Sequence, residues 1–346
     1  MFSLYTTEEN LSDLCLQRGN WYNIINNQSI VYVSSKDGGE EWDINNPVLI
    51  NLHKAGISIE VENKLADDIK KDHSKVLKLD NPVYLIDIDE AEAKKIEEEY
   101  GVICKNIKKS DEVGISEIGW DIDTSDTSKE QSWNFFFKGI KTPLNSLVVI
   151  DRYFFSSEKN KTKSSLNETI DDSFYNLSEI LNSLLPKNAK DGVVSIVILF
   201  DYDTLTEDID FKGLVQKVNR LKRNINRTYA YNIELISLNK DCYRYKDTHD
   251  RFIISNYFLV KATHKVKAFR RGNLSLVPQS LYFDYIFSKG IKPGEKSSIP
   301  IITQDRILNA IKDSLKTSKN IILHGCNGKE SGKGNFIIKN RLLFNS

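Results

Sequence analysis

A histidine, an arginine and an asparagine in the segment 248–256 have a spacing that could serve phosphate chemistry. Arg251 follows His249 by two residues, and Asn256 comes five residues after Arg251. Because alternate residues of a strand point to the same face, a strand here would place His249 and Arg251 side by side. An imidazole can act as a nucleophile or an acid, and a guanidinium can hold two phosphate oxygens. The spacing therefore predicts a site for a phosphate ligand.

The elements that must position this site alternate between strands and helices. Predicted strands are the apolar segments 29–34, 83–88, 102–104, 144–155, 193–200, 233–238 and 320–324. Predicted helices are the segments 11–16, 90–100, 174–185, 211–227 and 304–315. Residues 47–52 form a further apolar run, and segments 251–260 and 264–269 are predicted to pair as two strands. Strand–helix–strand order with short links predicts an α/β protein with parallel strands.

The charge of the chain divides it into an acidic and a basic half. Residues 1–135 hold 27 acidic and 14 basic side chains, a net charge of −13, whereas residues 136–346 hold 21 and 34, a net charge of +13. We predict an acidic α/β domain over 1–109, an acidic linker over 110–133 and a larger basic domain over 134–346. Such asymmetry suits a basic domain that binds nucleic acid, or two complementary halves that pack together.

The sequence predicts no metal, no cofactor and a cytoplasmic location. The four cysteines lie far apart without a CxxC pair, which is typical of reduced thiols. Asp87, Asp89 and Glu90 end a predicted strand where a metal could bind, although a helix cap explains them equally well. The glycine-rich segment 325–334 is predicted as a hairpin loop, because Gly334 stands where a P-loop requires Ser or Thr. No apolar run is long enough to span a membrane, and the first residues lack the pattern of a signal peptide.

The region 140–346 resembles the phospholipase D-like superfamily, and more closely its degenerate His-x-Arg branch from prokaryotic defence systems. The resemblance rests on the segments 148–155, 248–256 and 339–343. It implies a phospholipase D-like fold in which His249 attacks phosphorus, forming a phosphohistidine without a metal, while Arg251 neutralises the phosphate. Asn256 replaces the carboxylate of the family's His-x-Lys-x4-Asp pattern, and the glycine-serine element that follows it is missing. A neutral amide favours the imidazolium less, so we expect a site that binds phosphate rather than cleaves it.

One active site in this superfamily needs two such motifs, supplied by two lobes or by a homodimer. A second match to His-x-Lys-x4-Asp stands at His73, Lys75 and Asp80. It lies in the acidic half, where a phosphodiester is repelled, and no glycine-serine turn follows it. We interpret it as a coincidental match.

Basic side chains in two segments of the second half suit the backbone of a nucleic acid. Such cations, combined with nearby aromatic residues, bind single-stranded or duplex nucleic acid, although a solvated helix face is the commoner explanation. The predicted nucleic-acid-binding residues are Lys217, Arg220, Arg223, Arg227, Lys265, Lys267, Arg270 and Arg271.

Three functions remain open on the sequence. The first is a prokaryotic defence-type protein whose degenerate phospholipase D-like domain binds nucleic acid or another phosphate ligand. The second is an active, metal-independent phosphodiesterase or nuclease of the phospholipase D family. The third is a protein–protein adaptor, with a partner from the same operon and no ligand. A membrane partner is not expected.

Overall fold

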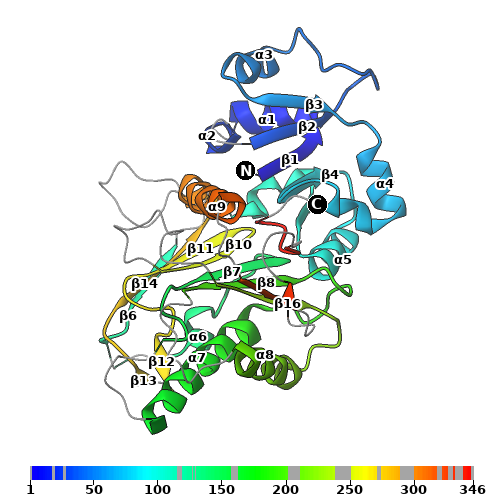
Figure 1. The fold of residues 1–346 in the computed structure, drawn as a ribbon. Helices are drawn as coiled ribbons and strands as arrows, with labels where there is room; N and C mark the ends of the chain where they lie inside the picture. The colour runs from blue at the N-terminus through cyan, green and yellow to red at the C-terminus, as the bar shows by residue number, and fades with distance from the viewer. Residues whose placement is uncertain are drawn as a thin grey trace.

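The computed structural model shows a mixed α/β fold built on two large sheets (Figure 1). It describes residues 2–343 except 18–19, 26–28, 115–118, 127, 129, 157–162, 202–210, 238–250, 271–273, 289–299, 318–321, 326–329 and 332–337. Residues of the first sheet precede those of the second along the chain. None of the helices in these described ranges is long and apolar enough to cross a membrane.

The first sheet is wholly parallel, with the strand order β3-β2-β1-β4-β5. Its strands are β1 (Phe2–Thr7), β2 (Ser29–Ser34), β3 (Ser58–Val61), β4 (Pro82–Ile86) and β5 (Ile103–Asn106). One face packs on α1 (Glu8–Gln17), α2 (Asn20–Ile25) and α3 (Pro47–Lys54). The other face packs on α4 (Leu65–Lys71), the 3-10 helix η1 (His73–Leu77) and α5 (Glu90–Tyr100). A second 3-10 helix, η2 (Ile107–Val113), follows β5.

The second sheet is mixed, with the strand order β16-β15-β9-β8-β7-β10-β11-β14-β6. Its parallel centre consists of β7 (Ser146–Ile150), β8 (Ser195–Phe200) and β9 (Asn232–Ser237). Antiparallel strands extend it on both sides: β10 (Arg251–Ser255), β11 (Phe258–Ala262), β14 (Ser280–Tyr285), β6 (Trp120–Asp123), β15 (Ile322–Gly325) and β16 (Glu330–Ser331). The predicted linker 110–133 therefore contributes an edge strand, β6. A separate ribbon pairs β12 (Phe269–Arg270) with β13 (Leu274–Ser275).

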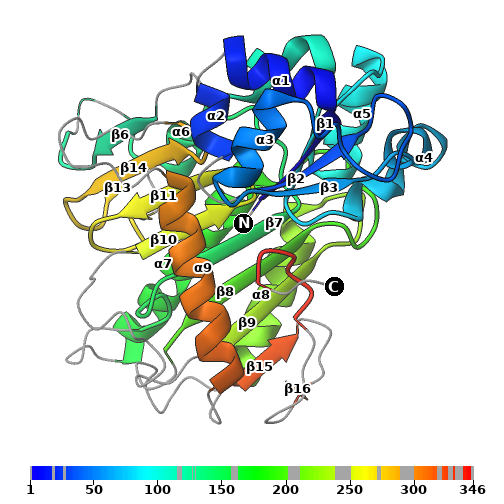
Figure 2. The same cartoon turned by 90° about the horizontal axis from the view of Figure 1, so that it is seen from above.

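Helices cover both faces of the second sheet. The short helix α6 (Trp133–Phe136), α7 (Lys163–Leu184) and α8 (Phe211–Ile225) pack on one face. The opposite face packs on α9 (Pro300–Thr317) and on the C-terminal residues Ile338, Leu342 and Leu343. Figures 1 and 2 show α9 on the same side of this sheet as the first sheet, with α7 and α8 on the far side. The alternation of apolar residues in β7 explains this arrangement, since Leu147 and Val149 face one layer and Val148 and Ile150 the other.

The predictions for segments 251–260 and 264–269 are wrong. The predicted strand 251–260 is a hairpin of β10 and β11, because the Ser255 hydroxyl accepts hydrogen bonds from the backbone of Tyr257 and Phe258 and turns the chain. The predicted strand 264–269 is mostly irregular: the Gln279 amide oxygen accepts from the backbone N–H groups of His264 and Lys265. These side chains provide the hydrogen bonds that a strand neighbour would otherwise provide.

The two sheets meet at a close contact around Gly101. This residue ends α5 in the left-handed conformation, with φ of 62°, as the sequence predicts. A Cβ atom here would lie 2.2 Å from the carbonyl oxygen of Leu144, just before β7. The buried Tyr257 hydroxyl donates to the Pro82 carbonyl and accepts from the Ile103 backbone N–H, 3.1 Å away. The contact therefore requires glycine, and the hydrogen bonds of Tyr257 fasten β4 and β5 to the second sheet.

Candidate functional site

Buried charged side chains lie at the carboxyl ends of β7 and β8, around Arg251. In open α/β sheets, ligands bind outside the carboxyl ends of parallel strands. Asp151 and Asp201 come directly after β7 and β8, and their side chains are 1% and 0% exposed. Strand β10 is antiparallel to β7 and begins at this same edge with Arg251. The fold thus brings two buried carboxylates to the predicted phosphate-binding arginine.

Asp151 fixes the position of Arg251. Its Oδ1 atom lies 3.2 Å from the Arg251 Nε and accepts the Tyr153 backbone N–H at 2.9 Å. The Oδ2 atom accepts the backbone N–H of Val266 at 2.9 Å. A carboxylate held by two backbone groups cannot turn freely, so it orients the guanidinium beside it.

A second ion pair lies beside the first. The Arg152 Nε donates to Asp201 Oδ2 at 2.7 Å, and the Arg152 side chain remains 30% exposed. Both guanidinium groups lie over the ring of Tyr153, with distances from Cζ to the ring centroid of 5.3 Å for Arg152 and 5.6 Å for Arg251. Tyr153 is 39% exposed, which makes it one of the few exposed large aromatic side chains of the described residues.

Lys267 adds a third cation to this edge. The residue is 6% exposed, and its Nζ donates to the Ser156 carbonyl at 3.3 Å. Burying an ammonium group costs free energy unless it is hydrogen-bonded or paired, and the Ser156 carbonyl provides such a hydrogen bond. We call Asp151, Arg152, Asp201, Arg251 and Lys267 the carboxyl-edge cluster. It has three cations and two carboxylates, a net charge of +1.

Asn256 does not belong to this cluster. Its Oδ1 accepts the backbone N–H groups of Asn145 and Ser146, at 3.1 and 2.9 Å, where β7 begins. Its carbonyl accepts from Asn81 Nδ2. Arg251 and Asn256 therefore lie at opposite ends of β10, and Asn256 joins β10 to the start of β7. His249, the predicted nucleophile, and Arg271 lie outside the described residues.

The second histidine motif also lies away from Arg251. His73 and Lys75 are in η1, where His73 Nε2 lies 2.9 Å from Glu92 Oε1 and Lys75 pairs with Asp72 at 3.7 Å. Asp80 follows this helix, beside Asn81 and hence at the Asn256 end of β10. The structure does not bring His73, Lys75 and Asp80 to the carboxyl-edge cluster.

The predicted basic helix α8 forms a groove with α7. This groove has a volume of about 270 Å³, and both Lys217 and Arg220 line it. Lys217 pairs with Asp171 at 3.0 Å and lies 5.9 Å from the ring centroid of Phe174. Tyr175 lines the groove beside Phe174. The sequence did not predict Phe174 and Tyr175 as groove residues, because apolar residues at helical spacing are typical of a buried helix face.

The groove adjoins the carboxyl-edge cluster. The Ser173 hydroxyl donates to the Phe154 carbonyl at 2.6 Å, and the rings of Phe155 and Phe174 lie 5.7 Å apart. Phe154 and Phe155 follow Tyr153 directly. Phe154 and Phe155 are 0% exposed, so these contacts connect the end of β7 with α7 through the hydrophobic core.

The other predicted nucleic-acid-binding residues differ in their contacts and in their exposure. Arg227 caps the C-terminal end of α7: its guanidinium donates to the carbonyls of Asn182, Leu185 and Pro186. Arg223 is exposed and donates to the Asn219 carbonyl of its own helix. Lys265 is half-buried and Arg270 is exposed. The structure therefore gives Arg227 a stabilising contact within the protein.

No group of three histidine, cysteine or carboxylate side chains in the described part of the chain could hold a metal ion. Asp89 precedes α5 at its N-cap position, without a side-chain hydrogen bond to the helix. No protein-family model matches the chain, and no curated protein matches it either.

Proposed function

We propose that this protein binds single-stranded nucleic acid across the carboxyl-edge cluster and the α7–α8 groove. The observation that carries the proposal is Tyr153, an exposed ring with two guanidinium groups over it, both held by buried carboxylates. Arginine and lysine side chains neutralise phosphates, and exposed aromatic rings stack on unpaired bases. Phe174, Lys217 and Arg220 place a partly exposed ring beside two further cations in the α7–α8 groove. The resemblance to degenerate phospholipase D-like proteins supports a place in a prokaryotic defence system.

The proposal is tested by the binding of fluorescent single-stranded DNA and RNA oligonucleotides at several salt concentrations. We expect Tyr153→Ala to weaken binding about tenfold with an unchanged salt dependence, because a stacked base contributes about 1–3 kcal/mol. Arg220→Ala should reduce the slope of log K against log salt by about 0.7, the value for one phosphate contact on a single strand.

Lys94→Ala is the matched control for the loss of one positive charge. Lys94 is 76% exposed on α5, in the first sheet, and its contact with Glu98 is 3.9 Å. If this variant weakens binding as much as Arg220→Ala, the effect is one of net charge and the proposed surface is wrong. If no oligonucleotide binds even at low salt, the adaptor function without a ligand replaces the proposal.

A second candidate function, a metal-independent phosphodiesterase, is favoured by the position of His264. Ala262 is the register partner of Arg251, and His264 follows it by two residues on the exposed edge where β10 begins. A histidine here could serve as an acid or a base for a phosphate held by Arg251. The test is hydrolysis of bis(p-nitrophenyl) phosphate in the presence of EDTA. Turnover that survives both His249→Ala and His264→Ala would exclude this mechanism.

A further inference from the structure

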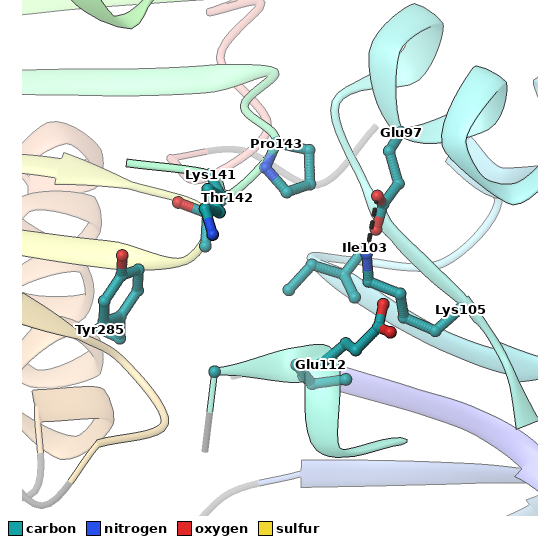
Figure 3. A pocket seen from close by; sticks show the side chains of 10 residues that line it. Glu97, Ile103, Lys105, Glu112, Lys141, Thr142, Pro143 and Tyr285 are labelled. Carbon is teal, nitrogen blue, oxygen red and sulfur yellow. Dashed lines mark hydrogen bonds and ion pairs between the residues drawn. The ribbon is translucent and has the colours of Figure 1, made fainter. Parts of the chain in front are cut away.

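A cavity of about 250 Å³ lies between the two sheets, away from the carboxyl-edge cluster. Its walls come from both halves of the chain: α5, β5 and η2 on one side, and residues 141–143 and β14 on the other. Figure 3 shows Glu97, Lys105 and Glu112 across an open space from Thr142, Pro143 and Tyr285. Small-molecule sites often lie at such junctions between structural units.

The charges around this cavity are balanced in number and sign. Two carboxylates, Glu97 and Glu112, and two ammonium groups, Lys105 and Lys141, line it. Glu97 and Lys105 form an ion pair of 2.9 Å on one wall, with side chains only 15% and 22% exposed. Glu112 is also paired, with Lys109 at 3.2 Å. Because the lining is neutral overall, a ligand of a single charge would leave one charge uncompensated, whereas a ligand with one charge of each sign keeps the cavity neutral.

The remaining walls are apolar. Ile103 and Val113 are 2% and 3% exposed, and the ring of Tyr285 and the side chain of Pro143 lie opposite. A cavity of about 150 Å³ holds one benzene molecule, so the present volume suits about ten non-hydrogen atoms. Thr142 also lines the cavity, and its hydroxyl is buried without a hydrogen-bond partner among the described residues. A buried hydroxyl of this kind usually has a partner, and a bound polar ligand would supply one.

We propose that this cavity binds a free L-amino acid with an apolar side chain. The α-carboxylate takes the cations and the Thr142 hydroxyl, the α-ammonium takes the carboxylates, and the side chain packs on Ile103, Val113 and Tyr285. The pKa of Glu97 supports this arrangement: burial raises it even though Lys105 is bound to the carboxylate, so a second cation would relieve its desolvation. Because the ligand touches both sheets, it stabilises the contact between them.

The proposal is tested by calorimetric titration of the full-length protein with L-leucine and two of its analogues. One analogue, 4-methylpentanoate, lacks the ammonium group, and the other, isopentylamine, lacks the carboxylate. We expect leucine to bind at least tenfold more tightly than either analogue, and to raise the midpoint of thermal unfolding by several degrees at saturation. Leucine, phenylalanine and glycine together test the apolar wall, with glycine the weakest.

Two variants and two matched controls assign the binding to this cavity. Lys141→Ala and Thr142→Val should each weaken leucine binding about tenfold, whereas Lys138→Ala and Thr228→Val, at exposed positions, should leave it unchanged. Neither cavity variant should alter oligonucleotide binding, so failure here is distinct from failure of the proposed function. The proposal is overturned if no amino acid binds at about 10 mM, if both analogues bind as well as leucine, or if both cavity variants bind like the wild type.

Discussion

Substitutions in the Arg251–Asp151 ion pair can separate its contribution to stability from its contribution to ligand binding. Arg251→Met removes the cation and keeps most of the side chain's volume. Asp151, 1% exposed, is then left with two backbone N–H groups and without its ion-pair partner. In the double variant Asp151→Asn/Arg251→Met, neither charge remains, and the asparagine carbonyl can still accept a backbone hydrogen bond.

The magnitudes follow from the burial of the pair. Breaking a buried ion pair by removing one partner costs about 3–5 kcal/mol, because the other charge stays buried. The double variant loses about one backbone hydrogen bond instead, which costs about 1–2 kcal/mol. We therefore expect Arg251→Met to lower the unfolding midpoint by roughly 10 °C and the double variant to recover more than half of that loss.

We expect the affinity for a ligand to depend on the presence of Arg251 and not on the stability of the variant. Both variants lack the Arg251 cation, so each should bind single-stranded oligonucleotides about tenfold more weakly, with a salt slope lower by about 0.7. The measurements are thermal unfolding for stability and fluorescence anisotropy for binding. A double variant that is as stable as expected but binds like the wild type would show that Arg251 serves the fold alone and would refute the proposed site.

Three further predictions concern other parts of the structure. Burial raises the pKa of Glu234 to about 7, so the folded protein holds this proton more tightly than the unfolded chain, and stability should fall as pH rises from about 4.5 to 7. Glu234→Gln should remove this dependence when unfolding midpoints are measured against pH. Gly101→Ala should cost at least about 2 kcal/mol in chemical unfolding, more than Gly56→Ala, whose backbone is also left-handed but whose surroundings are open. Arg227→Ala should cost about 1–2 kcal/mol through the cap of α7 and leave the salt slope of oligonucleotide binding unchanged; a reduced slope would restore its predicted nucleic-acid contact.

The sequence predicts the interior of the fold better than its irregular parts. Strands β4, β7, β8 and β9 are continuous apolar runs, and buried parallel strands have this pattern. The run 47–52 is a helix, and its signal was present: Asn46 caps α3 and Pro47 occupies the first turn. The turn between β10 and β11 has neither glycine nor proline, and the Ser255 hydroxyl accepts the backbone hydrogen bonds that close it. Ser255 and Asn256 are residue types that favour turns, but they stand inside an apolar run that resembles one long strand.

The candidate site was only partly predictable for a related reason. Arg251 and Lys267 stand out in the sequence as cations, but their surroundings depend on residues far away in the chain. Asp151 lies 100 residues before Arg251, and Asp201 lies 49 residues after Arg152. Composition cannot tell which cations meet a buried carboxylate and which remain on the surface. Only the order of the strands decides that, since it places the ends of β7, β8 and β10 together.

The geometry of β10 also changes the interpretation of Asn256 as part of a phosphate site. Five residues of extended strand span about 17 Å, so a side chain at 256 cannot orient a group beside Arg251. The carboxylate that does so is Asp151, on the neighbouring strand. Asn256, which stands where the phospholipase D-like pattern has a carboxylate, joins β10 to the start of β7, where its Oδ1 accepts two backbone N–H groups. It is no argument against phosphate chemistry at the other end of the strand, and that question depends on the two histidines, His249 and His264.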